Sequence, residues 1–196
     1  MDSETAAPEP DPTDDLLAPI VAERCRLLVV PPSVLDAVAA HPGVDLEWPG
    51  VGLLSGELTT TMPALHRIRQ LRDDPDLLAW LVRAIVVPDT SQSTGLAVVG
   101  HLGGHDRPDD DGVVEVGYTL ATTARGQGLA TEAARAWFGW AHDHGARQAR
   151  LSIQPTNVAS QGVARRLGLE AGRGSWDEDD AAWEVVWEAT LPLSTI

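Results

Sequence analysis

Residues 113–168 read VVEVGYTLATTARGQGLATEAARAWFGWAHDHGARQARLSIQPTNVASQGVARRLG and follow the order strand, glycine turn, helix, strand, helix. The turn RGQGLA, Arg125 to Ala130, lies where the first strand ends and the helix begins. Its glycines leave backbone N–H groups unobstructed, and the first N–H groups of a helix have no internal partners and carry the positive end of the dipole. The stretch therefore predicts a site for a phosphate-bearing cofactor.

Two other phosphate-binding loops are excluded by the residues around this turn. A Walker loop needs GxxxxGK[ST], and the chain contains no lysine. A dinucleotide fingerprint, GxGxxG, needs a third glycine where Thr131 stands, and no acidic residue closes a second strand. The pattern that remains is [Arg/Gln]-x-x-Gly-x-[Gly/Ala], which Arg125, Gly128 and Ala130 fill.

Three motifs in order extend this pattern: EVGY at 115–118, RGQGLATEA at 125–133, and NVAS at 157–160, which leads to VA at 163–164 and Gly168. Together they resemble the acetyl-CoA-binding core of the GNAT superfamily of N-acetyltransferases, and more narrowly its RimJ/RimL-like branch, the ribosomal-protein N-acetyltransferases. The resemblance is strong over about 113–170, moderate over 23–30 and 96–103, and weak over 31–80. Leu169 departs from the aromatic residue of the pattern.

The resemblance implies an α/β (α+β) fold with a single GNAT-type domain. Its mixed, mostly antiparallel central sheet would be splayed between the fourth and fifth strands, with helices on both faces. It also implies acetyl-CoA as co-substrate, and main-chain amides facing the pantetheine and thioester where the strand opens at a bulge. The implied cofactor-binding residues are Tyr118, Thr119 and Leu120 at the bulge, Arg125, Gly126, Gln127, Gly128, Leu129 and Ala130 at the pyrophosphate, and Asn157 as helix cap and pantetheine contact.

Acetyl transfer to an amine needs a base, because aliphatic amines are protonated at pH 7. In the strand over 113–121, Glu115 shares one face with Val113, Gly117 and Thr119, so a carboxylate projects from an otherwise apolar strand. Partial desolvation makes a carboxylate a better base. Glu115 is the candidate catalytic base, and a structural pairing with an arginine is the alternative.

The departing thiolate needs a hydrogen-bond donor. Many members of the superfamily use a tyrosine on the last motif helix, but here that helix reads SQGVARRLG and contains none. The resemblance to the ribosomal branch implies Ser160 as the second catalytic candidate. N-capping or packing at the helix start is the alternative for this serine.

The histidine pairs and the single cysteine do not predict a metal or catalytic site. The pairs His101/His105 and His142/His144 lack an i,i+4 placement on a predicted helix, so no metal site is expected. The single cysteine, Cys25, reads as a small buried residue of a strand and fits a reducing compartment.

Seven tryptophans raise the question of a stacking surface. Trp137, Trp140, Trp183 and Trp187 fall at core-like spacing. Trp48, in the motif WPG, is the candidate to line an acceptor pocket.

Length and charge set the remaining expectations. A chain of 196 residues suits one domain, predicted at 20–196 after a disordered acidic tail at 1–19. The formal net charge is −15; residues 20–196 hold 23 of the 29 acidic residues against 14 arginines and carry −9. This charge argues against nucleic acid and favours either a cationic partner or a role in solubility alone. No secretion leader or membrane span is visible, so a cytoplasmic location is expected. The protein is expected to be a monomer or a homodimer.

Periodicity predicts the other elements. Residues 44–60 are Gly-rich and give no clear prediction. Strands are predicted at 23–30, 83–87, 96–102, 113–121 and 149–154, with a final hairpin of 171–176 and 182–190; helices are predicted at 33–40, 63–71, 75–82, 128–143 and 157–167.

The sequence thus predicts an N-acetyltransferase that moves an acetyl group from acetyl-CoA to a primary amine by direct attack in a ternary complex. The acceptor would be a protein N-terminal α-amine or a small cationic amine. The alternative is a non-catalytic acyl-CoA-binding sensor or interaction module, since a phosphate cradle needs no chemistry.

Overall fold

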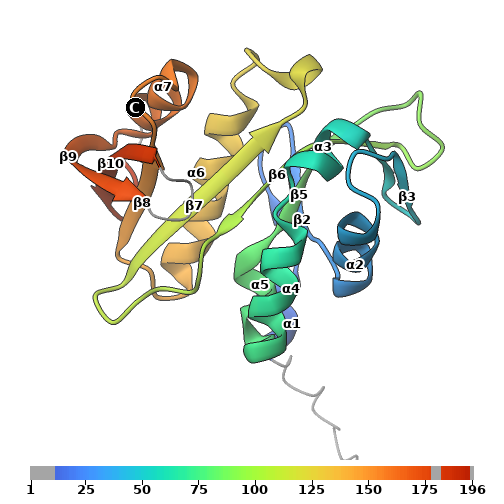
Figure 1. The fold of residues 1–196 in the computed structure, drawn as a ribbon, viewed down its shortest axis with the longest axis horizontal. Coiled ribbons are helices and arrows are strands. Elements are labelled where there is room, and N and C mark those ends of the chain that lie inside the picture. Colours follow the sequence, from blue (N-terminus) through green and yellow to red (C-terminus); the bar gives the residue numbers. More distant parts are fainter. Residues whose placement is uncertain (1–11, 178–181, 195–196) are drawn as a thin grey trace, which may run out of the picture.

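The computed structural model describes residues 12–177 and 182–194. An eight-stranded sheet crosses the molecule in the order β1-β2-β5-β6-β7-β8-β10-β9 (Figure 1). Its neighbouring strands are antiparallel except β7 and β8, which are parallel. The strands are β1 (Ile20–Val21), β2 (Arg26–Val29), β5 (Arg83–Pro88), β6 (Leu96–Gly104), β7 (Val113–Leu120), β8 (Gln148–Ile153), β9 (Glu170–Asp177) and β10 (Ala182–Thr190).

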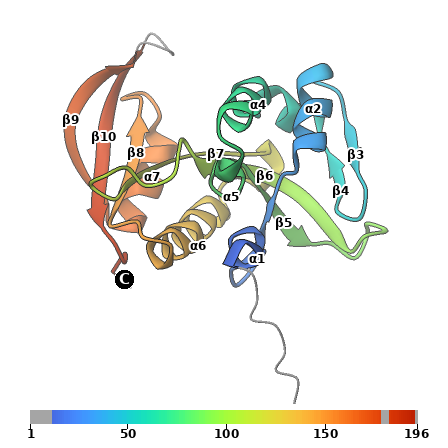
Figure 2. The same ribbon diagram turned by 90° about the horizontal axis from the view of Figure 1, so that it is seen from below.

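Helices cover both faces of this sheet, as Figure 2 shows. Two buried clusters, one on each face, fill the space between the helices and the strands. One face carries α2 (Pro32–Ala40), α3 (Gly56–Thr61), α4 (Ala64–Asp73) and the short η1 (Pro75–Leu77), with the small sheet of β3 (Leu46–Trp48) and β4 (Gly52–Leu54). The other face carries α1 (Pro12–Leu17), α6 (Leu129–Asp143) and α7 (Val158–Leu167). The short α5 (Leu78–Leu81) contributes residues to both clusters.

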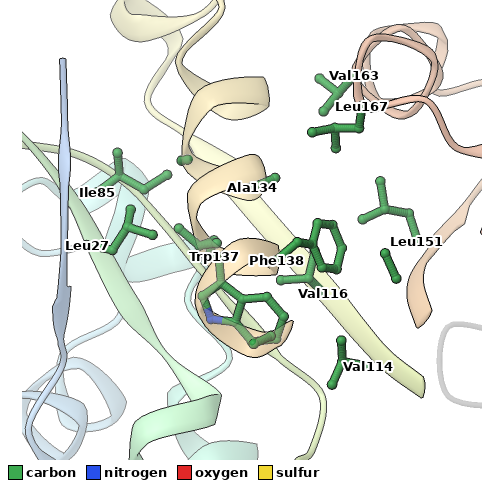
Figure 3. Packing of buried hydrophobic residues seen from close by; sticks show 14 of the residues in the cluster. Leu27, Ile85, Val114, Val116, Ala134, Trp137, Phe138, Leu151, Val163 and Leu167 are labelled. Atoms are coloured by element: carbon green, nitrogen blue, oxygen red, sulfur yellow. The ribbon is translucent and has the colours of Figure 1, made fainter. Parts of the chain in front are cut away.

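Helix α6 is the centre of the larger cluster. Its apolar residues recur every three to four positions, so that Ala134, Trp137 and Phe138 are buried on one stripe. Trp137 and Phe138 meet edge to face at 5.6 Å between ring centroids, and they pack beside Val116 of β7 (Figure 3). Burying each such side chain contributes about 1.5–3 kcal/mol, which fixes α6 against the sheet.

Strands β7 and β8 diverge soon after they meet. They pair only from Val113 to Glu115 with Gln148 to Arg150, whereas β7 goes on pairing with β6 up to Leu120. These are the fourth and fifth of the predicted strands, so the predicted splay is confirmed. Beyond Glu115, the backbone groups of β7 that point towards β8 therefore have no strand partner.

The bulge expected around Tyr118 to Leu120 is absent from β7. Strands β6 and β7 keep one register from Gly100↔Leu120 to Gly104↔Val116. The irregularity lies instead between β5 and β6, at Ile85/Val86. Divergence from β8 already frees one edge of β7, so no extra residue is needed to open it.

The prediction of a disordered tail at 1–19 is wrong for residues 12–17. Pro12–Leu17 is a helix, and the carbonyls of Leu16 and Ala18 accept hydrogen bonds of 2.6 Å and 2.9 Å from the guanidinium of Arg83. Arg83 is fully buried, and burial lowers its pKa to about 10. A buried guanidinium needs acceptors, and α1 supplies them. Residues 1–11 of the predicted tail lie outside the described residues.

One tryptophan, Trp183, differs from expectation. Trp48 is 9% exposed and packs in the cluster with residues of α2 and α3, and its place beside an acceptor stays a prediction. Trp183 is 54% exposed and lies opposite Trp176 in the β9–β10 hairpin. Trp137 and Trp187 are buried as predicted, and so is Cys25.

Candidate active site

A cavity of about 740 Å³ lies where β7 and β8 diverge. Three segments line it: the end of β7, the glycine turn with the first turn of α6, and the first turns of α7. Among its lining residues are ten that the sequence singled out: Tyr118, Thr119, Leu120, Arg125, Gly126, Gly128, Leu129, Ala130, Asn157 and Ser160. Gln127 and Glu115 do not line it.

The glycine turn has the conformation that an anion cradle requires. Gly126 and Gly128 have φ angles of 73° and 79°, in the left-handed region that side chains disfavour. Gly128 is the N-cap of α6, so the free N–H groups of the helix start directly after it. A Cβ atom at Gly126 would meet no atom within 4 Å, so this side of the turn is open to a ligand.

Arg24, in the β1–β2 connection, anchors the turn from outside. Its Nε donates to Glu132 Oε2 at 2.7 Å, and its Nη1 donates to the carbonyl of Gln127 at 3.0 Å. The Gln127 side chain donates back to the carbonyl of Thr123 at 3.0 Å, so this residue braces the turn. The sequence pattern did not identify Arg24, because its partners are more than one hundred positions away.

Arg125 braces the end of β7. Its Nε donates to the carbonyl of Leu120 at 2.9 Å, and its Nη2 lies 3.3 Å from Glu57 Oε1 of α3. Hydrogen bonds from the Thr122 hydroxyl and N–H lower the pKa of Glu57, and Arg125 acts in the same direction. The strand end, the turn and α3 are thus held together in one network.

Arg166 is a second arginine that the sequence did not identify. It comes from α7, lines the cavity, and donates from Nε to Thr131 Oγ1 at 3.2 Å. A guanidinium beside a helix N-terminus is suited to a phosphate group. The only sequence signal is the pair Arg165-Arg166 on a predicted helix, which does not say which arginine faces α6.

Ser160 and Tyr118 meet at the floor of the cavity. The Asn157 side chain caps α7 by accepting from the Ser160 N–H at 3.0 Å, which leaves the Ser160 hydroxyl free of the capping role. The buried Tyr118 hydroxyl has no partner at full hydrogen-bond geometry among the described residues, but it lies close enough to the Ser160 side chain to interact with it. Burial raises the pKa of Tyr118, and the neighbouring Ser160 and Arg166 oppose the rise. A neutral phenol therefore lies beside Ser160.

Glu115 lies on the other face of β7, at the last residue that pairs with β8. Its carboxylate is 24% exposed and lies 3.8 Å from His105 Nδ1. Arg150 stands opposite it in register but pairs with Glu188 at 2.8 Å. The predicted alternative, a structural pair with an arginine, is therefore not what this geometry favours.

Residues 12–177 and 182–194 contain neither a membrane-spanning helix nor a cluster of metal ligands. None of their helices combines the length and apolar character needed to cross a bilayer. Nor do three or more His, Cys, Asp or Glu side chains in these residues come together as ligands for a metal ion.

A sheet that opens beside the glycine turn and the start of a helix is the geometry expected of a protein that binds a phosphate-bearing coenzyme. The model of the acetyltransferase (GNAT) domain matches residues 26–170, and the chain belongs to this family. It is therefore an acetyl-CoA-dependent acetyltransferase. No curated protein sequence matches the chain.

Solved structures share the fold at low sequence identity. Mycobacterium smegmatis RimJ, in complex with CoA-disulfide, superposes with a TM-score of 0.61 at 15% identity over 92% of each chain. The ribosomal L7/L12 α-N-protein acetyltransferase RimL gives 0.58 at 16% over 89% of this chain and 94% of its own. A GNAT-family acetyltransferase from Bacillus anthracis gives 0.59 at 16% over 88% and 98%.

Proposed function

We propose that this protein transfers the acetyl group of acetyl-CoA to a primary amine by direct attack in a ternary complex. The acceptor is a protein N-terminal α-amine or a small cationic amine. The observation that carries the proposal is the opening between β7 and β8, which has an anion cradle on one side and the Glu115 carboxylate on the other. Such an opening lets the thioester and the amine approach from opposite faces of the sheet.

The donor half of the site fits coenzyme A. Backbone N–H groups of residues 125–130 receive the pyrophosphate, and Arg166 adds positive charge beside them. The backbone groups of Tyr118 and the N–H of Leu120, which face away from β6, hydrogen-bond the pantetheine and the thioester oxygen, where charge develops during attack; the Leu120 carbonyl is held by Arg125. Asn157 extends the same binding surface from α7.

The acceptor half supplies the base. Glu115 takes a proton from the ammonium form of the acceptor, and the neutral amine then attacks the thioester carbonyl. The tetrahedral adduct collapses and the C–S bond breaks. The thiolate accepts a hydrogen bond from the Ser160 hydroxyl, and the proton that the acetylated nitrogen loses passes through this hydroxyl to the sulfur, so that serine ends neutral. Tyr118, neutral and buried behind Ser160, supports the orientation of that hydroxyl.

The charge of the chain supports an amine acceptor over a nucleic acid. The formal net charge of −15 repels phosphate backbones and attracts cations. The lone cysteine, a buried free thiol, suits a reducing compartment such as the cytoplasm.

The proposal is tested by measuring thiol release from acetyl-CoA with a panel of acceptors: peptides with free N-termini, polyamines and amino sugars. Release that depends on one acceptor class, with matching acetylated product by mass spectrometry, is expected. Tight coenzyme binding with no release across the panel would favour the non-catalytic acyl-CoA-binding module.

A further inference from the structure

His105 is placed beside Glu115 by three independent contacts. Its backbone N–H donates to the carbonyl of Glu115 at 2.9 Å. Its own carbonyl accepts from Arg67 Nη1 at 3.2 Å and Gln70 Nε2 at 2.8 Å, both from α4. The main chain of this residue is therefore fixed between the sheet and the helix, immediately after β6 ends.

The absence of a side chain at Gly117 makes room for the imidazole. A Cβ atom built there would lie 3.3 Å from His105 Nε2, which is tighter than an ordinary contact. The ring thus lies over Gly117, and its Nδ1 faces Glu115 Oε1 at 3.8 Å. The His105 side chain is 56% exposed, so it exchanges protons with water, whereas the Glu115 carboxylate is more enclosed.

Among the described residues, the other ionisable groups on this face have partners or are buried. Arg150 of β8 pairs with Glu188 of β10, and Arg67 of α4 is buried. His101, on the same face of β6, is buried, and burial, followed by the charge of Arg67, lowers its pKa to about 4, so it stays neutral. Asp106 acts on Arg67. His105 is thus the exposed titratable group within ion-pair distance of Glu115 among the described residues.

We propose that His105 is a positioning residue for the general base: it orients the Glu115 carboxylate and carries away the proton that this carboxylate removes from the amine. The inference rests on the proposed function. After Glu115 has become a carboxylic acid, its proton passes through one bridging water to His105 Nδ1, 3.8 Å away, and the imidazolium then releases a proton to bulk water. Each turnover thus returns Glu115 and His105 to their starting protonation states. Imidazole accepts and releases protons near neutral pH, which suits this step.

The first test uses His105→Ala in the full chain. Its kcat should fall about 10-fold, less than the roughly 10²-fold or more expected for a lost general base, because Glu115 is still present; the KM for acetyl-CoA should stay unchanged. Added imidazole should restore the rate of His105→Ala in proportion to its free-base concentration, and should not restore His105→Gln, whose side chain fills the space. His66→Ala, an exposed histidine of α4, is the control and should behave as wild type.

The second test asks whether His105 acts through Glu115. In a Glu115→Gln background, adding His105→Ala should cause no further loss of kcat. A wild-type rate for His105→Ala, a loss that imidazole does not restore, or an additive loss in the double variant would each overturn the inference. A wild-type rate for Glu115→Gln alone would instead refute the base assignment in the proposed function. Unchanged circular dichroism and coenzyme affinity exclude misfolding as the cause.

Discussion

Among single residues, Glu115 carries the most weight in the proposed chemistry. Its carboxylate projects from β7 where the strand leaves β8, on the face opposite the cavity. Glu115→Gln should lower kcat by about 10²-fold or more, since a positioned general base typically contributes that much. Coenzyme affinity should change little. Steady-state rates from pH 6 to 9 check this, and a rate equal to wild type throughout would remove Glu115 from the mechanism.

Buried His101 makes stability depend on pH. Desolvation and Arg67 lower its pKa from 6.5 to about 4. Between these values the unfolded chain binds a proton that the folded chain does not, so this contribution to stability is complete above about pH 6.5 and falls as pH drops to 4. Urea unfolding should show a loss of about 2 kcal/mol from this group between pH 7 and pH 5. His101→Gln should have a flatter profile over that interval; equal slopes would contradict the assignment.

The local sequence was enough to predict the glycine turn and the cap of α7. Gly126 and Gly128 lie in that turn and adopt left-handed conformations, and Asn157 caps α7. Each of these roles depends on residues only a few positions away. Arg24 and Arg166 were not predicted, since their partners come from distant elements. Glu115 could be proposed from strand alternation, but its neighbour His105 follows from the pairing of β6 with β7.

At the scale of elements, the strongly periodic segments were predictable. Helix α6 and strands β5, β6 and β7 occupy nearly their predicted ranges, because their apolar spacing matches the face they bury. The Gly-rich residues 44–60 gave no prediction, and the structure places β3, β4 and most of α3 there. Strands of three residues carry too short a pattern to be identified by periodicity.

Helix α1 escaped prediction because Arg83 holds it from a distance. The short helix packs few apolar groups, but its end supplies two carbonyl acceptors to a buried guanidinium. Deleting residues 1–19 should therefore lower the free energy of unfolding by about 1.5–3 kcal/mol, because the Arg83 guanidinium keeps Ala79 as an acceptor and exchanges its other two acceptors for water. Deleting residues 1–11, which leaves α1, should cost little. Urea denaturation of both truncations measures this, and equal stability for the two would contradict the role of α1.

The charge of the whole molecule bears on its acceptor. Residues 20–196 carry a formal charge of −9, and the described acidic segment Asp109–Asp111 is exposed. If the electrostatic field of these acidic residues steers a cationic amine to the site, kcat/KM for that amine should fall as added salt screens the field. For a neutral amine of similar size, kcat/KM should depend little on salt concentration. Deleting residues 1–11 should leave both slopes unchanged. Identical salt dependence for charged and neutral acceptors would leave solubility as the only role of the acidity.

The central claim is that the opening of the sheet binds coenzyme A with its pyrophosphate at residues 125–130. Gly128→Val would place a side chain at a φ of 79°, in the middle of the cradle, and Gly50→Val provides a matched control with the same φ and open space around it. The strain is about 1–2 kcal/mol in each case, so both variants should remain folded. Calorimetric titration with coenzyme A should show binding by wild type and Gly50→Val and none by Gly128→Val; undiminished affinity in a folded Gly128→Val protein would contradict the account.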